Sequence, residues 1–80
     1  MSSLFRPYVL RRNGRIVYCG ITNNPDRRCR EHARDKDFDE IEVRGPPMTR
    51  DRARAAERRA LQQYRFCRGR LPEYNRSPTG

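Results

Sequence analysis

Apolar and β-branched residues fall into two short runs near the start of the chain. Residues 8–12 and 15–21 are rich in tyrosine, valine, leucine and isoleucine, and the Asn13-Gly14 pair between them is a strong hairpin signal. We therefore expect two antiparallel strands that are joined by a tight turn at Asn13-Gly14.

The length of this turn decides where two tyrosines point, because the side chains of a strand alternate between the faces of a sheet. A two-residue loop would place Tyr8 opposite Cys19 and turn the phenols of Tyr8 and Tyr18 to opposite faces. A three-residue loop over 12–14 would place Tyr8 directly opposite Tyr18, with Gly14 closing a type I turn plus bulge. We predict the three-residue loop, with both phenols on one face.

Two helices and a third strand are expected after the hairpin. The first helix spans about Asp26–Arg34, with Asn24 as its N-cap and Pro25 at its first position. The second helix begins after Thr49, as N-cap, and extends to residue 64 or 65. Residues 40–44 alternate between polar and apolar side chains, as a strand does.

The resulting order β-β-α-β-α predicts an α+β fold, in which helices flank a three-stranded, mainly antiparallel sheet. With 80 residues, the chain is long enough for one domain, over residues 1–80. No apolar run reaches the length of a membrane span, and the first residues lack a signal-peptide pattern. We therefore expect a cytoplasmic protein without membrane contact, whose thin core leaves a homodimer open.

Charge adds the expectation of a polyanionic partner. The formal net charge is +9, and the basic residues are 18 arginines and a single lysine. The planar arginine fork matches phosphate oxygens, so nucleic acid is the simplest partner. The alternative is a solvated surface that is merely rich in arginine.

The second helix contains an acidic residue where apolar ones are expected. Glu57 lies within its stripe of apolar side chains, and a carboxylate there is costly unless it is paired or binds a cation. A salt bridge to an arginine of the sheet is the alternative. On the first helix, Arg28 and His32 are four residues apart and share a face.

Two other groups could bind metal, but we favour simpler roles for both. Cys29 and His32 have zinc-like spacing, but no CxxC motif accompanies them, so the cysteines are expected to be small, partly buried apolar residues. Five acids in the segment 35–42 are expected to form a solvated loop and strand edge that discourages edge pairing.

The spacing of these residues resembles that of the GIY-YIG nuclease superfamily, over about residues 7–76. The first motif ends at Tyr8, the second is Tyr18-Cys19-Gly20, and Arg28 and His32 follow at the family's spacing. The first motif departs from its name, because Arg6-Pro7 stands where Gly-Ile would.

Two further positions resemble the family more loosely. Glu57, in the segment 53–57, is similar to the glutamate that binds metal, and Asn75 is similar to an asparagine near the end of the domain. The resemblance implies one Mg²⁺ or Mn²⁺ ion at Glu57. It also implies structural support of the site by Gly20 and Asn75, and DNA contacts from an arginine-rich surface that includes Arg27, Arg54 and Arg58.

The implied chemistry is phosphodiester hydrolysis. Arg28 would clamp the phosphate, and Tyr8 would act as the base, with its pKa lowered by Arg28 and the metal. Tyr18 and His32 would position water and phosphate.

The resemblance leaves the substrate open between single-stranded, duplex and branched DNA. Three other functions remain open: a toxin-like nuclease that acts on DNA or RNA, a non-catalytic nucleic-acid-binding module, and a small zinc-dependent adaptor.

Overall fold

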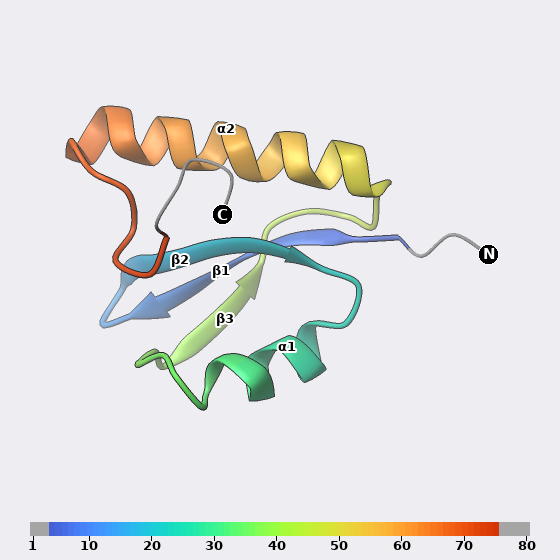
Figure 1. The fold of residues 1–80 in the computed structure, drawn as a ribbon, viewed down its shortest axis with the longest axis horizontal. Helices are drawn as coiled ribbons and strands as arrows, with labels where there is room; N and C mark the ends of the chain where they lie inside the picture. Colours follow the sequence, from blue (N-terminus) through green and yellow to red (C-terminus); the bar gives the residue numbers. More distant parts are fainter. Residues whose placement is uncertain (1–3, 76–80) are drawn as a thin grey trace.

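The structure is a computed structural model that describes residues 4–75. The strands are β1 (Arg6–Arg12), β2 (Arg15–Thr22) and β3 (Glu40–Val43), and the helices are α1 (Pro25–His32) and α2 (Arg50–Arg68). The strands form one antiparallel sheet in the order β2-β1-β3, with α2 along one side and α1 on the other (Figure 1). The predicted α+β class and the order of elements are confirmed. No helix within residues 4–75 is long and apolar enough to cross a membrane.

Apolar side chains fill both sides of the sheet because successive residues of a strand point to opposite faces. Toward α2, the core contains Val9, Cys19 and Leu61 together with Ile16 and Leu71. On the other side, it contains Tyr8, Leu10 and Val17 together with Tyr18, Phe38, Ile41 and Tyr74. The catalytic candidates Tyr8 and Tyr18 therefore lie on the side of the sheet that faces away from α2.

The predicted three-residue hairpin loop is wrong. Arg12 pairs with Arg15, so the loop is Asn13-Gly14 alone, and both of its residues have positive φ (54° and 80°), as a type I′ turn requires. The register then shifts by one residue between Leu10 and Arg11. This shift is a β-bulge, and it reverses the parity that a two-residue turn would otherwise impose.

The bulge restores the predicted outcome by another route. Beyond it, Tyr8 pairs with Gly20 and Leu10 pairs with Tyr18. Paired residues share a face, and so do alternate residues of one strand, so Tyr8 and Tyr18 lie diagonally on the same face. Val17 joins this same cluster although it is adjacent to Tyr18 in the chain, because the bulge interrupts the alternation.

The helix caps explain where both helices begin. The Asn24 side chain accepts a hydrogen bond from the Arg27 N–H (3.1 Å), and the Thr49 hydroxyl accepts one from the Arg52 N–H (3.3 Å), as predicted. The helix ends differ from the prediction. α1 ends at His32, and α2 continues to Arg68, where Gly69 adopts a left-handed conformation (φ 75°) that closes the helix.

The segment after α2 covers the outer edge of β2 (Figure 1). The Tyr74 N–H donates a hydrogen bond to the Val17 carbonyl (2.8 Å). The Asn75 amide both accepts a hydrogen bond from the Cys19 N–H (2.8 Å) and donates one to the Cys19 carbonyl (3.1 Å). Asn75 thus pairs with the main chain of β2 as a neighbouring strand would, and this holds the strand that carries Tyr18 and Gly20.

Candidate active site

Three aromatic rings from different elements meet on the α1 side of the sheet. A hydrogen bond of 2.5 Å joins the Tyr8 Oη to the His32 Nε2, and both residues are almost fully buried. The Tyr18 ring centroid lies 6.1 Å from that of Tyr8 and 4.9 Å from that of His32. The structure thus brings together three of the residues that the sequence motifs single out.

Gly20 makes room for these rings. A Cβ atom at this position would lie 2.8 Å from both the Tyr8 Oη and the Tyr18 Cε2, which is closer than real Cβ contacts. Any larger residue would therefore displace the two phenols. The tyrosine-x-glycine spacing of the second motif has a direct steric cause here.

Two opposite charges approach the same phenols. The Arg28 guanidinium on α1 lowers the pKa of both Tyr8 and Tyr18, whereas the Glu57 carboxylate on α2 raises both. Arg28 is exposed and forms an ion pair with the Glu31 Oε1 (3.3 Å). Tyr8, Tyr18 and His32 therefore form one contiguous group, and Arg28 and Glu57 act on its two phenols through their charges.

Arg28 lowers the pKa of Tyr8, as expected, but its charge does not decide the net shift. Burial raises the pKa of Tyr8, and the nearby Tyr18 raises it further, which outweighs the charge of Arg28. The pKa of His32 shifts the other way: burial lowers it, and the charges of Lys36 and Arg28 lower it further. At neutral pH the site therefore holds a neutral phenol beside a neutral imidazole.

Glu57 is buried on the face of α2 that packs against the sheet. Burial raises the pKa of its carboxyl group, while Arg54 and Arg58 on either side lower it. Within residues 4–75, the carboxylate forms no ion pair or hydrogen bond, so the alternative of a salt bridge to the sheet is not realised. A carboxylate without a partner suits a divalent cation that takes few protein ligands and keeps several waters, as Mg²⁺ does.

The space beside Glu57 is only partly shared with the aromatic group. Tyr8, Gly20 and Glu57 line a hollow of about 550 Å³ along α2, whereas Tyr18, Arg28 and His32 lie outside its lining. In the part of the chain that the structure describes, no group of three or more histidine, cysteine or acidic side chains is placed to hold a metal ion. Cys19 is buried, Cys29 is partly buried and Cys67 is exposed.

Three of the five acids of the segment 35–42, Asp37, Glu40 and Glu42, lie beside arginines. Glu42 binds Arg11 (3.0 Å) and Arg44 (3.2 Å), and Asp37 lies 3.8 Å from Arg12. The acidic segment therefore neutralises arginines of the sheet and is more than a solvated loop.

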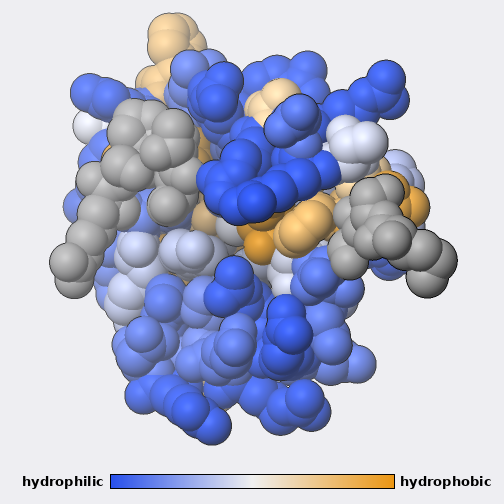
Figure 2. Space-filling model, turned by 45° about the vertical axis from the view of Figure 1, so that its right-hand side comes forward, coloured by the Kyte–Doolittle hydropathy of each residue, from blue (hydrophilic) through white to orange (hydrophobic). Residues whose placement is uncertain are grey.

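The arginines of α2 have no such partners among residues 4–75. The helix contains Arg50, Arg52, Arg54, Arg58, Arg59, Arg65 and Arg68. Figure 2 shows a face that is largely hydrophilic, with a narrow apolar strip at the height of the sheet between α2 above and α1 below. The helix that carries Glu57 thus presents seven arginines that no acidic partner among residues 4–75 neutralises.

A comparison with protein families matches residues 8–71 to the GIY-YIG catalytic domain. The chain belongs to the GIY-YIG family. Comparisons with curated proteins and with solved structures gave no match. GIY-YIG domains are nucleases that act on nucleic acids, and they generally use a divalent metal.

The GIY-YIG match includes the five predicted site residues Tyr8, Tyr18, Arg28, His32 and Glu57, and Asn75 lies beyond its end. Arg54 and Arg58 flank Glu57 on α2 and act on its pKa. Arg27 is exposed on α1, where its guanidinium donates a hydrogen bond to the Asn23 side chain (3.2 Å).

Sequence reasoning missed Lys36 as a neighbour of the GIY-YIG site. Its ammonium group lies 5.1 Å from the centroid of the Tyr18 ring, and its charge lowers the pKa of His32. Lys36 occupies the turn after α1, where no helical or strand spacing applies. The sequence offered one sign of a special position, which is that Lys36 is the single lysine beside 18 arginines.

Proposed function

We propose that this GIY-YIG chain is a metal-dependent endonuclease that hydrolyses phosphodiester bonds of DNA. The observation that carries the proposal is the short hydrogen bond between the Tyr8 Oη and the His32 Nε2, at a point where the charges of Arg28 and Glu57 both act. A buried phenol paired with a neutral imidazole can move a proton, and the two charges can bind a phosphate and a cation.

Because its pKa is raised, Tyr8 is a neutral phenol at neutral pH and not a phenolate. The proton of the attacking water therefore needs a second acceptor. As the attacking water gives its proton to the Tyr8 Oη, the phenol gives its own proton to the His32 Nε2. His32 becomes an imidazolium and later releases the proton to solvent. Tyr8 thus contacts the water, and His32 is the final base, which its lowered pKa suits because the imidazole starts neutral.

Arg28 and Glu57 handle the charge that develops on the phosphate. The exposed Arg28 guanidinium can donate hydrogen bonds to non-bridging oxygens, where negative charge accumulates in the transition state. Glu57 would hold one Mg²⁺ or Mn²⁺ ion, which when bound supplies a Lewis acid for the phosphate and the leaving oxygen. Gly20 keeps the phenols in place, and Asn75 keeps β2 in place.

The distribution of charge supports a nucleic-acid substrate. The arginines of α2 lack acidic partners among residues 4–75, and Arg54 and Arg58 stand beside Glu57. We assign phosphate contacts to Arg27, Arg54 and Arg58. DNA is the substrate that we propose, with RNA as the alternative to be tested.

Cleavage assays test the proposal directly. Purified protein is incubated with labelled single-stranded, duplex and branched DNA and with RNA, each with Mg²⁺, with Mn²⁺ or with EDTA. We expect divalent-dependent cleavage of at least one DNA form. Glu57→Gln and Arg28→Ala should abolish cleavage, and Glu57→Gln should retain binding.

Glu40→Gln is the matched control, because it removes an exposed carboxylate that lies 3.8 Å from Arg11, away from the site. Full cleavage in EDTA, or by Glu57→Gln, would contradict the role of the metal. Salt-sensitive binding of DNA without any turnover would instead favour the non-catalytic binding module.

A further inference from the structure

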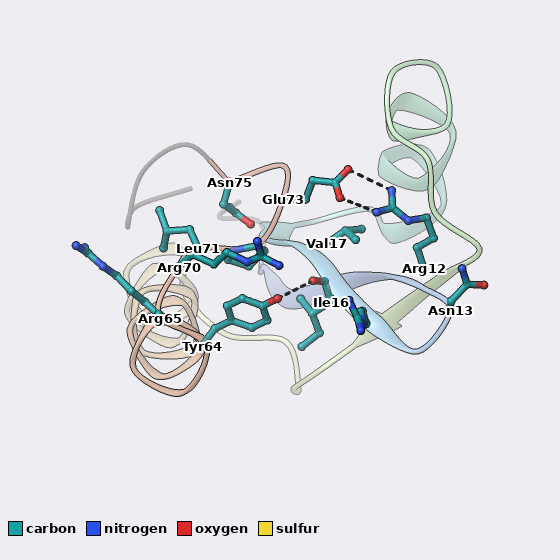
Figure 3. A pocket seen from close by; sticks show the side chains of 13 residues that line it. Arg12, Asn13, Ile16, Val17, Tyr64, Arg65, Arg70, Leu71, Glu73 and Asn75 are labelled. Carbon is teal, nitrogen blue, oxygen red and sulfur yellow. Dashed lines mark hydrogen bonds and ion pairs between the residues drawn. The ribbon is translucent and has the colours of Figure 1, made fainter.

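A second hollow lies at the hairpin end of the molecule, between the start of β2, the last turns of α2 and the segment that follows α2 (Figure 3). Its volume is about 1070 Å³. None of the residues assigned to catalysis above lines it, although Asn75 borders it. The proposed function therefore leaves this hollow unexplained.

The rim of the hollow carries unneutralised positive charge. Arg15, Arg65 and Arg70 line it and form no ion pair with any residue among 4–75. Arg12 and Glu73 also line it, but they bind each other through two contacts of 2.6 and 3.2 Å. Three guanidinium groups are thus left for an anionic ligand, and their forked geometry suits phosphate oxygens.

Part of the wall of the hollow is apolar and includes an aromatic ring. Ile16, Tyr64 and Leu71 line it, and the Tyr64 hydroxyl donates a hydrogen bond to the Ile16 carbonyl (3.4 Å), which orients the ring. In Figure 3 the Tyr64 ring and Arg70 lie along the same side of the hollow. An apolar ring beside guanidinium groups matches a nucleotide, since the base can stack while the phosphate binds arginine.

One flank of α2 connects this hollow to the catalytic site. Arg54, Arg58 and Arg65 are spaced by four and seven residues, which places them on one face of the helix. The first two flank Glu57, and the third lines the hollow. From Arg58 to Arg65 the helix rises by about 10 Å, so this face of α2 runs from the residues beside Glu57 to the hollow.

Resting on the nuclease function proposed above, we infer that this hollow binds an unpaired stretch of the nucleic-acid strand on one side of the cleaved phosphate. Arg15, Arg65 and Arg70 hold its backbone, and Tyr64 stacks on a base. An unpaired strand fits better than a duplex, because the bases of a duplex are already stacked inside the helix and would leave the apolar wall uncovered.

Salt-dependent binding tests the arginines. The double variant Arg65→Ala/Arg70→Ala is compared with Arg30→Ala/Arg34→Ala, which likewise removes one arginine of a helix and one just after its end. The probe is a labelled single-stranded oligothymidylate in EDTA, so that binding is measured without cleavage. We expect the first pair to reduce the slope of log affinity against log salt by about 1.4, as the loss of two phosphate contacts does for a single strand. The control pair should leave the slope nearly unchanged.

Two further variants test stacking on the aromatic ring. Tyr64→Leu should weaken binding of the single strand by about fivefold or more without changing the salt slope, and Tyr64→Phe should retain binding. Equal slopes for the two arginine pairs would overturn the inference. Duplex binding that falls as much as single-strand binding in Tyr64→Leu would overturn the preference for an unpaired strand.

The same proteins distinguish this inference from the proposed function. If the wild-type protein cleaves no nucleic acid but the arginine pairs differ in slope, the nuclease proposal fails and the binding site stands as a nucleic-acid site alone. If the wild-type protein cleaves and the pairs do not differ, the hollow has no part in binding.

Discussion

Tyr8 on β1 and His32 at the end of α1 share a hydrogen bond, although 24 residues separate them in the chain. Tyr8→Phe keeps the ring and removes the proton that this bond moves. We expect the cleavage rate to fall by about 10²- to 10⁴-fold, the usual contribution of a positioned acid or base. The free energy of unfolding should fall by only about 1 kcal/mol.

Tyr74→Phe is the control for this substitution. The Tyr74 hydroxyl accepts a hydrogen bond from the Asp37 N–H (3.0 Å), so its loss also removes one bond from a tyrosine. Cleavage should be unaffected. Wild-type rates in Tyr8→Phe would remove the phenol from the mechanism.

Besides burial, the charge of Lys36 should help to keep the cleavage activity at acidic pH, because both lower the pKa of His32. Lys36 lowers the pKa of His32, so neutral imidazole persists below its usual pKa of 6.5. In Lys36→Met this positive charge is gone, the pKa of His32 rises, and the acidic limb of the rate profile moves to higher pH. Lys36→Arg keeps the charge and should keep the wild-type limb.

NMR titration of the imidazole checks this prediction directly, since His32 is the single histidine of the chain. Stability should follow the same group. Because its folded pKa lies below its unfolded value, the contribution of His32 to stability is complete above about pH 6.5 and is lost as the pH falls through the folded pKa. An unchanged titration in Lys36→Met would contradict the electrostatic link.

Glu57 should destabilise the folded protein at neutral pH. Burial raises the pKa of its carboxyl group, so its contribution to stability is present below the usual pKa of 4.5 and is lost as the pH rises through the folded pKa. Glu57→Gln removes the buried charge, and we expect a higher midpoint of urea unfolding at pH 7 than for the wild type. The difference should shrink toward pH 4.5. A lower midpoint at pH 7 would mean that the carboxylate has a stabilising partner.

Alanine substitutions at Gly20 and Gly14 should distinguish a loss of cleavage caused at the site from one caused by a less stable fold. Gly20→Ala forces a Cβ against the Tyr8 Oη and the Tyr18 ring, so cleavage should be lost, with a destabilisation of about 1–3 kcal/mol. Gly14→Ala meets no neighbour within 4 Å but has a φ of 80°, which costs an alanine about 1–2 kcal/mol. We expect the two variants to have comparable unfolding midpoints, while only Gly14→Ala retains cleavage. Equal cleavage rates in the two variants would refute the steric role of Gly20.

Local signals predicted most of the elements. Asn24 and Thr49 mark helix starts because their side chains cap free N–H groups, and Asn13-Gly14 marks the turn because both residues accept positive φ. Gly69 carried the same kind of signal for the end of α2, as the residue after a basic last turn. The short prediction for this helix came from following its apolar stripe, which stops at Tyr64.

Features that depend on tertiary packing escaped the sequence. The bulge at Val17 lets the adjacent side chains of Val17 and Tyr18 pack in one cluster with Tyr8. The alternation of polar and apolar residues along a strand does not reveal where such an extra residue is inserted. The net pKa of Tyr8 depends on how deeply its hydroxyl is buried, which the motif does not encode. The position of Lys36 over the Tyr18 ring depends on the path of an irregular turn.

The pairing of the acidic segment with Arg11, Arg12 and Arg44 has a consequence for the first encounter with substrate. It cancels charge around β1 and β3 and leaves Arg27 and Arg30 of α1 and the arginines of α2 without an ion pair among residues 4–75. A polyanion that approaches by diffusion is therefore drawn toward the two helices rather than toward the strand edge at β3. Collisions at low ionic strength are thereby more often productive, and added salt both slows association and weakens the complex.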